Sequence, residues 1–135
     1  MNNTIRLEIV TPEAALYSED VNMVTLPGVE GQMGILPQHA RLMTQLVPGE
    51  LIVNKGGHDD FMAVGEGLVE ITNERVSIVT NMAIALDKID EAVAEEARQR
   101  AAARLREKLS SEELASVNAA LARSLAQLNV KRRHR

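Results

Sequence analysis

Residues 26–46, LPGVEGQMGILPQHARLMTQL, hold the densest turn signals in the chain. Gly28, Gly31 and Gly34 recur at every third position, and two prolines lie close to them. Each glycine inside a helix would cost about 1 kcal/mol, so this spacing predicts an extended segment that turns sharply. No Gly-Lys-Ser/Thr sequence follows, which argues against a phosphate-binding loop. On chemistry alone, a tight hairpin and an exposed contact loop fit the stretch equally well.

The composition restricts the class of function. The chain has 135 residues, of which 45% are hydrophobic but only 1% aromatic, so we expect an aliphatic core and no base-stacking surface. It has no cysteine, which removes disulfides and thiol chemistry. The apolar runs are too short to span a bilayer, and MNNTIRLEIV alternates in polarity, unlike a signal peptide. We therefore expect a soluble protein in a cytoplasm-like compartment.

Charge and turn residues divide the chain near Lys88. Residues 1–88 carry 5 basic and 12 acidic side chains, a net charge of −7. Residues 89–135 carry 10 basic and 7 acidic side chains, a net charge of +3, and the two values sum to the overall −4. All eight glycines and all four prolines precede residue 68. The sequence therefore predicts two domains, 1–88 and 89–135.

The first domain contains short alternating or β-branched segments separated by turn residues. The predicted strands are 5–9, 21–26, 51–53, 61–64, 68–71, 76–79 and 83–86. Residues 56–60 and 72–75 predict hairpin loops. Strands at this spacing predict a β sandwich, or flattened antiparallel barrel, with an aliphatic core between two sheets.

The first domain offers no recognisable catalytic or metal-binding constellation. His39 and His58 lie far apart in the sequence and have no partner at metal-ligand spacing. Asp59 and Asp60 are adjacent, which would put them on opposite faces of a strand, and we expect them to be solvated turn residues. The serines lack a nucleophile-elbow context. We therefore expect no catalytic residue and no metal, and interpret this domain as a rigid platform.

The second domain predicts two antiparallel helices. Residues 90–108 form the first, with acidic residues in its first turn and basic residues near its end. Its predicted apolar face consists of Val93, Ala97, Ala101 and Leu105. Ser110 and Glu113 predict a capping box that starts the second helix. The apolar stripe of that helix consists of Leu114, Val117, Leu121, Leu125 and Leu128.

The predicted hairpin has only eight large apolar side chains, three on the first helix and five on the second. Burying them at about 2 kcal/mol each does not match the cost of ordering the segment at about 1 kcal/mol or more per residue. The hairpin should therefore need a docking surface. Permanent docking and exchange between two docking sites both stay open.

The basic run KRRHR at residues 131–135 fits a solvated tail. It also fits contact with nucleic acid, an anionic lipid surface or an acidic protein patch. The net charge of −4 and the lack of aromatic residues disfavour nucleic-acid binding.

The glycine-rich stretch resembles a known family. The sequences LPG, EGQMGILP and HARLMT, at 26–28, 30–37 and 39–44, closely resemble the epsilon subunit of the bacterial F-type (rotary) ATP synthase. The resemblance extends over the whole chain in length, order and domain plan. The family usually has proline after His-Ala, where this chain has Arg41.

This resemblance implies a non-catalytic subunit that bridges the gamma shaft and the membrane c-ring and so couples ion-driven rotation to ATP synthesis. The implied c-ring contact consists of Glu30, Gly31 and Gln32. The implied gamma contact consists of Thr11, His39, Leu42, Met43 and Thr44. The protein would lie peripherally at the cytoplasmic face of the bacterial plasma membrane, held there only through the complex.

The resemblance also implies a regulatory hairpin, which folds against the sandwich or extends into the alpha/beta catalytic head and restrains ATP hydrolysis. The implied inhibitory residues are Arg98, Arg100, Arg104 and Arg123.

Some members of the family bind ATP through Ile/Leu-Asp-x-x-Arg-Ala. Ile89 and Asp90 match this motif and Arg123 matches a further family arginine, but Val93 and Gln127 replace two other arginines. Losing two cations removes charge-assisted hydrogen bonds to phosphate, so we expect weak or no ATP binding and no cofactor.

Two functions of other classes are alternatives to this one. A stand-alone β-sandwich binding module could dimerise through the stripe at 114–128, and a stable dimer that ignores a gamma partner would favour it. A small hydrolase has no supporting constellation in the sequence.

Overall fold

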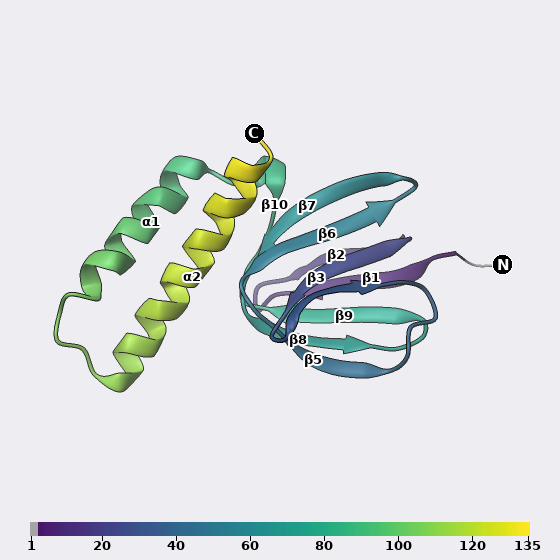
Figure 1. The fold of residues 1–135 in the computed structure, drawn as a ribbon, viewed down its shortest axis with the longest axis horizontal. Helices are drawn as coiled ribbons and strands as arrows, with labels where there is room; N and C mark the ends of the chain where they lie inside the picture. Colours follow the sequence, from purple (N-terminus) through teal and green to yellow (C-terminus); the bar gives the residue numbers. More distant parts are fainter. Residues whose placement is uncertain (1–2) are drawn as a thin grey trace.

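The protein folds into a β sandwich followed by two helices, as the computed structural model of residues 3–135 shows (Figure 1). The described strands are β1 Ile5–Val10, β2 Ala15–Val21, β3 Met23–Gly28, β4 Gly31–Ile35, β5 Leu42–Leu46, β6 Gly49–Lys55, β7 His58–Val64, β8 Gly67–Ile71, β9 Arg75–Thr80 and β10 Ala83–Ala85. A short 3-10 helix, η1 (Leu86–Lys88), leads into helices α1 (Glu91–Arg104) and α2 (Ser111–Arg133).

The strands form one sheet that curls into a flattened barrel (Figure 1). Their order is β10-β7-β6-β3-β5-β8-β9-β1-β2, and β4 pairs with β3 outside this path. The pairs are antiparallel except β1–β9, in which Leu7 lies opposite Val76 in parallel register. The predicted fold class is confirmed, with this one parallel pair as the difference.

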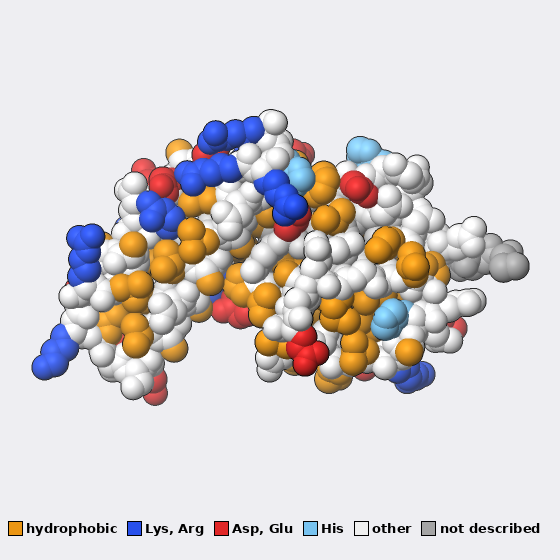
Figure 2. All heavy atoms as spheres, in the orientation of Figure 1, with side chains coloured by type: hydrophobic (Ala, Val, Ile, Leu, Met, Phe, Trp, Pro, Cys, Tyr) orange, Lys and Arg blue, Asp and Glu red, His pale blue; other side chains and the backbone are white. Residues whose placement is uncertain are grey.

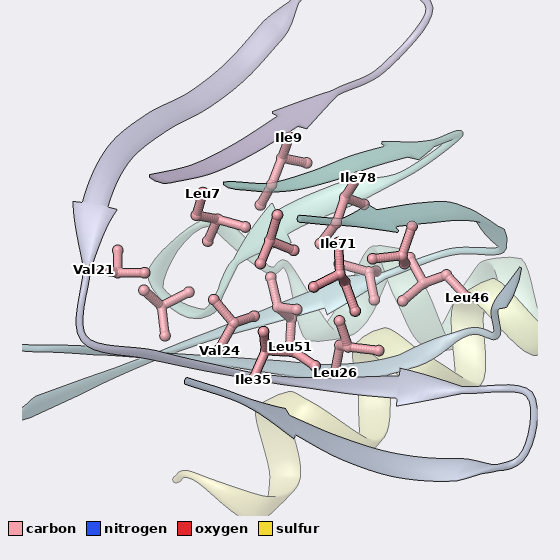
Figure 3. Close-up of a cluster of buried hydrophobic side chains, with 14 of the residues drawn as sticks. Leu7, Ile9, Val21, Val24, Leu26, Ile35, Leu46, Leu51, Ile71 and Ile78 are labelled. Carbon is pink, nitrogen blue, oxygen red and sulfur yellow. The ribbon is translucent and has the colours of Figure 1, made fainter. Parts of the chain in front are cut away.

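An aliphatic core fills the sandwich (Figure 3). In β1, Ile5, Leu7 and Ile9 are buried while Arg6 and Val10 face solvent, which is the alternation expected of a half-buried strand. Figure 3 shows the side chains of Leu7, Ile9, Val21, Val24, Leu26, Ile35, Leu46, Leu51, Ile71 and Ile78 in this core. Tyr17 is partly buried at its edge, and Phe61, also partly buried, packs against a separate small cluster, so the core is aliphatic as predicted.

The glycine-rich stretch forms the β3–β4 hairpin. Gly28 pairs with Gly31 across the turn, and Gly31 has a φ of 121°, which favours glycine. A Cβ on Gly28 would lie 3.1 Å from the Gly31 carbonyl oxygen, so the two strands approach closely there. The structure thus contains the predicted hairpin, and its tip is also exposed as a contact loop would be.

Two strands and one turn differ from the prediction. The sequence analysis missed β2 because most of its residues are exposed, and it missed β5 because Leu42 and Met43 both face solvent at its start. The β6–β7 turn contains only Gly56 and Gly57, whose φ angles are 61° and 79°. Asp59 and Asp60 are therefore exposed residues of β7, and their assignment to a turn was wrong.

The helical hairpin starts as predicted but turns earlier. Asp90 is the N-cap of α1, and its Oδ1 accepts a 3.1 Å hydrogen bond from the Val93 amide. Helix α1 ends at Arg104, four residues before the predicted end, because residues 105–109 reverse the chain towards α2. The capping box is present: the Glu113 amide donates to Ser110 Oγ and the Ser110 amide donates to Glu113 Oε1, both at 3.1 Å.

Helix α2 lies between α1 and the sandwich, and α1 forms the outer layer (Figure 1). The predicted helix faces are only partly right for this reason. Val93 and Leu105 are exposed, whereas Ala94 and Ala101 are the buried residues of α1. A middle helix needs two buried sides, so its buried residues do not follow the predicted stripe. They are Val117, Ser124, Ala126, Leu128 and Val130.

Candidate partner-binding surfaces

The predicted c-ring residues Glu30, Gly31 and Gln32 form a contiguous exposed tip on the β3–β4 hairpin. The exposed apolar side chain of Val29 extends this tip. The Val29 amide donates a 3.0 Å hydrogen bond to the Gln45 carbonyl oxygen, which ties the hairpin to β5. The tip is therefore a fixed projection that can make contacts without refolding.

The predicted gamma residues lie on and around β5 in differing environments. Met43 is 65% exposed, Leu42 is exposed, and Thr44 is half-buried. His39 is partly buried, and its Nδ1 lies 2.7 Å from the Ala40 carbonyl oxygen, to which it donates if protonated at that nitrogen. Thr11 differs from the others because it is buried.

The side chain of Thr11 serves the β1–β2 turn. Its hydroxyl donates a 3.3 Å hydrogen bond to the Ala14 carbonyl oxygen, and its amide donates to the same oxygen at 2.9 Å. Any contribution of Thr11 to a partner surface therefore comes through the shape of the turn.

An exposed apolar row crosses the outer face of the sheet beside β5. Leu68 lies opposite Val79 in the β8–β9 pair, and Val79 lies opposite Val10 in the β1–β9 pair. Leu68 is 54% and Val79 is 58% exposed, and Val10 is also an exposed large hydrophobic residue. Met43 points to the same face, because it pairs with Glu70, two residues from Leu68. Adjacent exposed apolar residues of this kind mark an interaction surface.

Sequence reasoning missed this row. It could have been found from the alternation of side chains in β8 and β9. Val69 and Ile78 are buried, so the residues next to them must point to the opposite face of the sheet. Leu68 and Val79 therefore point outward, at positions where a strand with one solvated face normally carries polar residues.

The four predicted inhibitory arginines do not form one cluster. Arg98 binds Glu95 on the same helix, with Nε 2.7 Å from Oε2 and Nη2 2.9 Å from Oε1. These hydrogen bonds lower the pKa of Glu95 below its usual value. Arg100 and Arg104 are exposed on α1, and Arg104 lies 3.5 Å from Glu113 of α2. Lys and Arg side chains gather over the helices on the face shown in Figure 2.

Helix α2 docks on the edge of the sandwich near β7 and β10. Its buried Val130 joins Ala63 and Ile89 in a small cluster. The partly buried residues packed against this cluster are Phe61, Met82, Ile84 and Leu86. The hairpin is therefore in its docked arrangement in this structure.

The residues of the predicted nucleotide motif have structural roles. Ile89 is buried in the docking cluster, and Asp90 caps α1. Arg123 Nη1 lies 3.3 Å from Glu66 Oε2, so its nearest partner is an acidic side chain. Val93 is exposed, and Gln127 Nε2 lies 3.3 Å from Met82 Sδ. Arg123 is already paired with a carboxylate, and the positions of the two other family arginines carry the uncharged Val93 and Gln127, so these residues fit a triphosphate poorly.

Within 3–135, no three histidine, aspartate or glutamate side chains come together as a metal site. No helix in the same range is long and apolar enough to cross a membrane.

These features define a two-domain binding protein: a sandwich with an exposed tip and an apolar outer row, joined to a docked helical hairpin. The family described as ATP synthase, Delta/Epsilon chain, beta-sandwich domain matches residues 4–86, and its long alpha-helix domain matches residues 87–132. The chain belongs to the ATP synthase delta/epsilon chain family. This family supplies the epsilon subunit of ATP synthase, a stalk subunit and not the catalytic one.

Individual relatives agree with this assignment. The ATP synthase epsilon chain of Herpetosiphon aurantiacus is 44% identical over 126 residues, which cover 93% of each chain. That of Chloroflexus aggregans is 44% identical over 131 residues, which cover 97% of this chain and 94% of the relative. The resemblance found in the sequence is therefore confirmed.

Two solved structures share the fold. A chain in the cryo-EM structure of the Euglena gracilis mitochondrial ATP synthase, OSCP/F1/c-ring, has a TM-score of 0.75 and 27% identity, covering 90% of this chain and 78% of that chain. A chain in the Tetrahymena thermophila mitochondrial ATP synthase central stalk/c-ring structure has a TM-score of 0.67 and covers 94% and 96%. Its identity is 10%, so it supports the fold alone.

Proposed function

We propose that this chain bridges the gamma shaft and the c-ring in the central stalk of an F-type ATP synthase, so that ion-driven rotation is coupled to ATP synthesis. The observation that carries the proposal is the exposed apolar row Val10–Val79–Leu68 beside Met43. A rigid sandwich with such a row on one face and a projecting tip on another offers two binding surfaces on one body.

The apolar row and β5 together form the proposed gamma surface. Leu42 and Met43 supply further exposed apolar area, and His39 and Thr44 supply polar groups at its margin. Thr11 acts here by holding the turn that follows Val10. Arg41, which stands where the family usually has proline, is exposed next to this surface and adds a positive charge to it.

The proposed c-ring surface is the hairpin tip Glu30-Gly31-Gln32. Gly31 needs its positive φ to form the turn, and Glu30 and Gln32 flank it as exposed polar groups. Through these contacts the protein would sit peripherally at the cytoplasmic face of the bacterial plasma membrane.

The proposed regulatory role belongs to the helical hairpin. In an extended state, Arg98, Arg100, Arg104 and Arg123 would meet acidic residues of the alpha/beta catalytic head and slow ATP hydrolysis. Arg123 would first have to leave Glu66, and Val130 would have to leave its cluster with Ala63. The hairpin can act as a brake only if the docked and extended states are close in free energy.

The test uses the cognate catalytic head with its gamma shaft. Binding and ATP hydrolysis are measured with no addition, with the full chain and with a chain ending at Lys88. Binding of both forms with slowed hydrolysis only by the full chain supports both roles. If both forms bind and neither slows ATP hydrolysis, the inhibitory role is ruled out and only the structural role remains.

A matched pair of variants tests the apolar row itself. Leu68→Asp with Val79→Asp places two charges in the row, and we expect binding to gamma to be lost. Glu74→Lys changes an exposed charge in the β8–β9 turn and should leave binding unchanged. If the row variant still binds as tightly as the unaltered chain, the proposed gamma surface is wrong.

The structure gives no support to a dimer formed through the α2 stripe. Leu114 and Leu125 are exposed, but Val117 and Leu128 are buried within the chain. Dimerisation through the whole stripe would therefore require α2 to leave its present contacts.

A further inference from the structure

The basic end of the chain has acidic partners within the protein. Arg132 Nε lies 3.0 Å and Arg135 Nη2 lies 2.5 Å from Glu91 Oε2, in the first turn of α1. Arg132 Nη2 also lies 3.9 Å from Glu95 Oε1, one turn further along α1. The end of α2 is thus tied to the beginning of α1.

A second set of contacts ties the same segment to the sandwich. Arg133 Nη1 lies 3.3 Å from Glu50 Oε1, and His134 Nε2 lies 2.5 Å from Glu50 Oε2. The Glu50 side chain, at the start of β6, is only 10% exposed. The His134 ring stacks on the Phe61 ring of β7, with centroids 3.8 Å apart and planes 23° apart. Lys131 Nζ donates a 3.2 Å hydrogen bond to the Leu86 carbonyl oxygen in η1.

We propose that residues 131–135 form an electrostatic latch that holds the helical hairpin on the sandwich. The latch joins four elements at one point: α1 through Glu91, β6 through Glu50, β7 through Phe61 and η1 through Leu86. Release of the hairpin from the sandwich breaks the links to Glu50, Phe61 and Leu86. The link to Glu91 stays within the hairpin and fixes the end of α2 against the start of α1.

The latch adjoins an apolar contact in which three residues are buried and four more, Phe61, Met82, Ile84 and Leu86, are partly buried. The buried residues of the docking cluster are Ala63, Ile89 and Val130. Helix α1 packs mainly on α2, so it contributes little to the attachment of the hairpin to the sandwich. Arg132 and Arg135 lower the pKa of Glu91 by hydrogen bonding, so this carboxylate stays charged in the docked form.

The latch makes docking sensitive to salt. The Arg133 side chain, which pairs with Glu50, is 69% exposed, so added salt weakens this attraction as the screening length falls from about 10 Å at 0.1 M to about 3 Å at 1 M. Single exposed pairs contribute little, but several pairs that share carboxylates act as one network. Docking would therefore weaken as salt concentration rises, and it would need no nucleotide.

This inference concerns the isolated chain and does not depend on the proposed function. The chain has no cysteine, so a Glu13→Cys, Glu107→Cys pair can carry two spin labels without further changes. Both glutamates are exposed, one in the β1–β2 turn and one between the helices. The distribution of distances between the two spin labels gives the released fraction, which is the fraction of molecules whose hairpin has left the sandwich.

Three forms are compared at 50 mM and 500 mM KCl: the full chain, Arg133→Gln with His134→Gln, and a chain ending at Val130. We expect removal of the latch to raise the released fraction about tenfold at low salt and to abolish most of its salt dependence. Arg106→Gln, which changes an exposed arginine after α1, is the control and should behave like the full chain.

Charge exchange separates the latch from a general loss of helix stability. Glu50→Arg alone should raise the released fraction, and adding Arg133→Glu should lower it again. If truncation disturbs α2, the glutamine variant and the charge exchange, which both keep the full length of the chain, decide whether the latch exists. Equal released fractions for the full chain and the glutamine variant at both salt concentrations would overturn the proposal.

Discussion

Arg123 and Glu66 join α2 to the β7–β8 turn, with Arg123 Nη1 3.3 Å from Glu66 Oε2. The other carboxylate oxygen, Glu66 Oε1, is buried and has no hydrogen-bond partner among the described residues. A Cβ on the neighbouring Gly65 would lie 3.4 Å from Arg123 Cδ, so the arginine stem packs closely on this turn. Arg123 therefore already has a carboxylate partner where family resemblance places a nucleotide contact.

The first prediction concerns ATP binding by this chain. We expect calorimetry to detect no micromolar ATP affinity in the unaltered chain. Val93→Arg with Gln127→Arg should create measurable ATP binding, because each new cation can add a charge-assisted hydrogen bond worth about 1.5–3 kcal/mol. Val93→Leu with Gln127→Asn is the control and adds no charge. Micromolar binding by the unaltered chain would contradict the prediction.

The second prediction uses adjacent residues of β9 that face opposite ways. Ile78 is fully buried and Val79 is exposed in the apolar row. Ile78→Ala should lower the free energy of unfolding by about 2–5 kcal/mol, because it leaves a cavity in the aliphatic core. Val79→Ala should change it by less than about 0.5 kcal/mol. Urea unfolding measures the change in free energy for both variants. Equal changes would mean that Ile78 does not point into the core while Val79 points outward.

The third prediction concerns the close approach of β8 and β9. A Cβ on Gly67 would lie 2.0 Å from the Val79 carbonyl oxygen, which is a backbone atom and cannot move aside. Gly67→Ala should therefore destabilise the protein by about 1–3 kcal/mol.

Gly34→Ala provides the comparison for Gly67. Its added Cβ would meet only the Met23 methyl group, at 2.6 Å, and that flexible side chain can rotate away. We expect a smaller loss of stability from Gly34→Ala than from Gly67→Ala in the same unfolding experiment. The reverse order would show that the β8–β9 pair can shift to accept a side chain.

The fourth prediction concerns acid. The backbone amide and hydroxyl of Ser110 lower the pKa of Glu113 by hydrogen bonding to it. A carboxyl with a lowered folded-state pKa stabilises the fold above its unfolded pKa, about 4.3, and loses that effect as pH falls through the folded value. The protection of amides in the first turn of α2, expressed relative to the exchange rate of an unstructured peptide at the same pH, should therefore fall below about pH 4.3. Glu113→Gln keeps a capping side chain and should weaken this pH dependence.

Local patterns predicted the parts of the fold that depend on neighbours in the sequence. The alternation of Ile5, Leu7 and Ile9 predicted β1, and Ser110 with Glu113 predicted the start of α2. The sharp turn of the 26–46 stretch followed from its glycines, whereas the choice of Glu30-Gly31-Gln32 as a contact tip came from the family resemblance. Each of these features depends on turn residues, helix caps or hydrophobic periodicity, all of which can be read from a short stretch of sequence.

Features that depend on distant residues were not predictable in this way. Leu68 and Val79 become one surface only because β8 and β9 pair with β1. The two buried sides of α2 follow from its position between α1 and the sandwich. The tail residue Arg132 looked solvated in the sequence, and its partner Glu91 becomes evident only once the helices lie antiparallel.

The position of β1 has a consequence for synthesis on the ribosome. Its first neighbour, β2, follows directly, but the other neighbour, β9, emerges only at residues 75–80. Until then the growing chain exposes one unpaired edge of its first strand, which is a template for aggregation. Leu7 can pair with Val76 only after β9 has been synthesised, and pairing between residues so far apart in the sequence is slow. Nascent chains that stall before Thr80 should therefore be the forms that need chaperones.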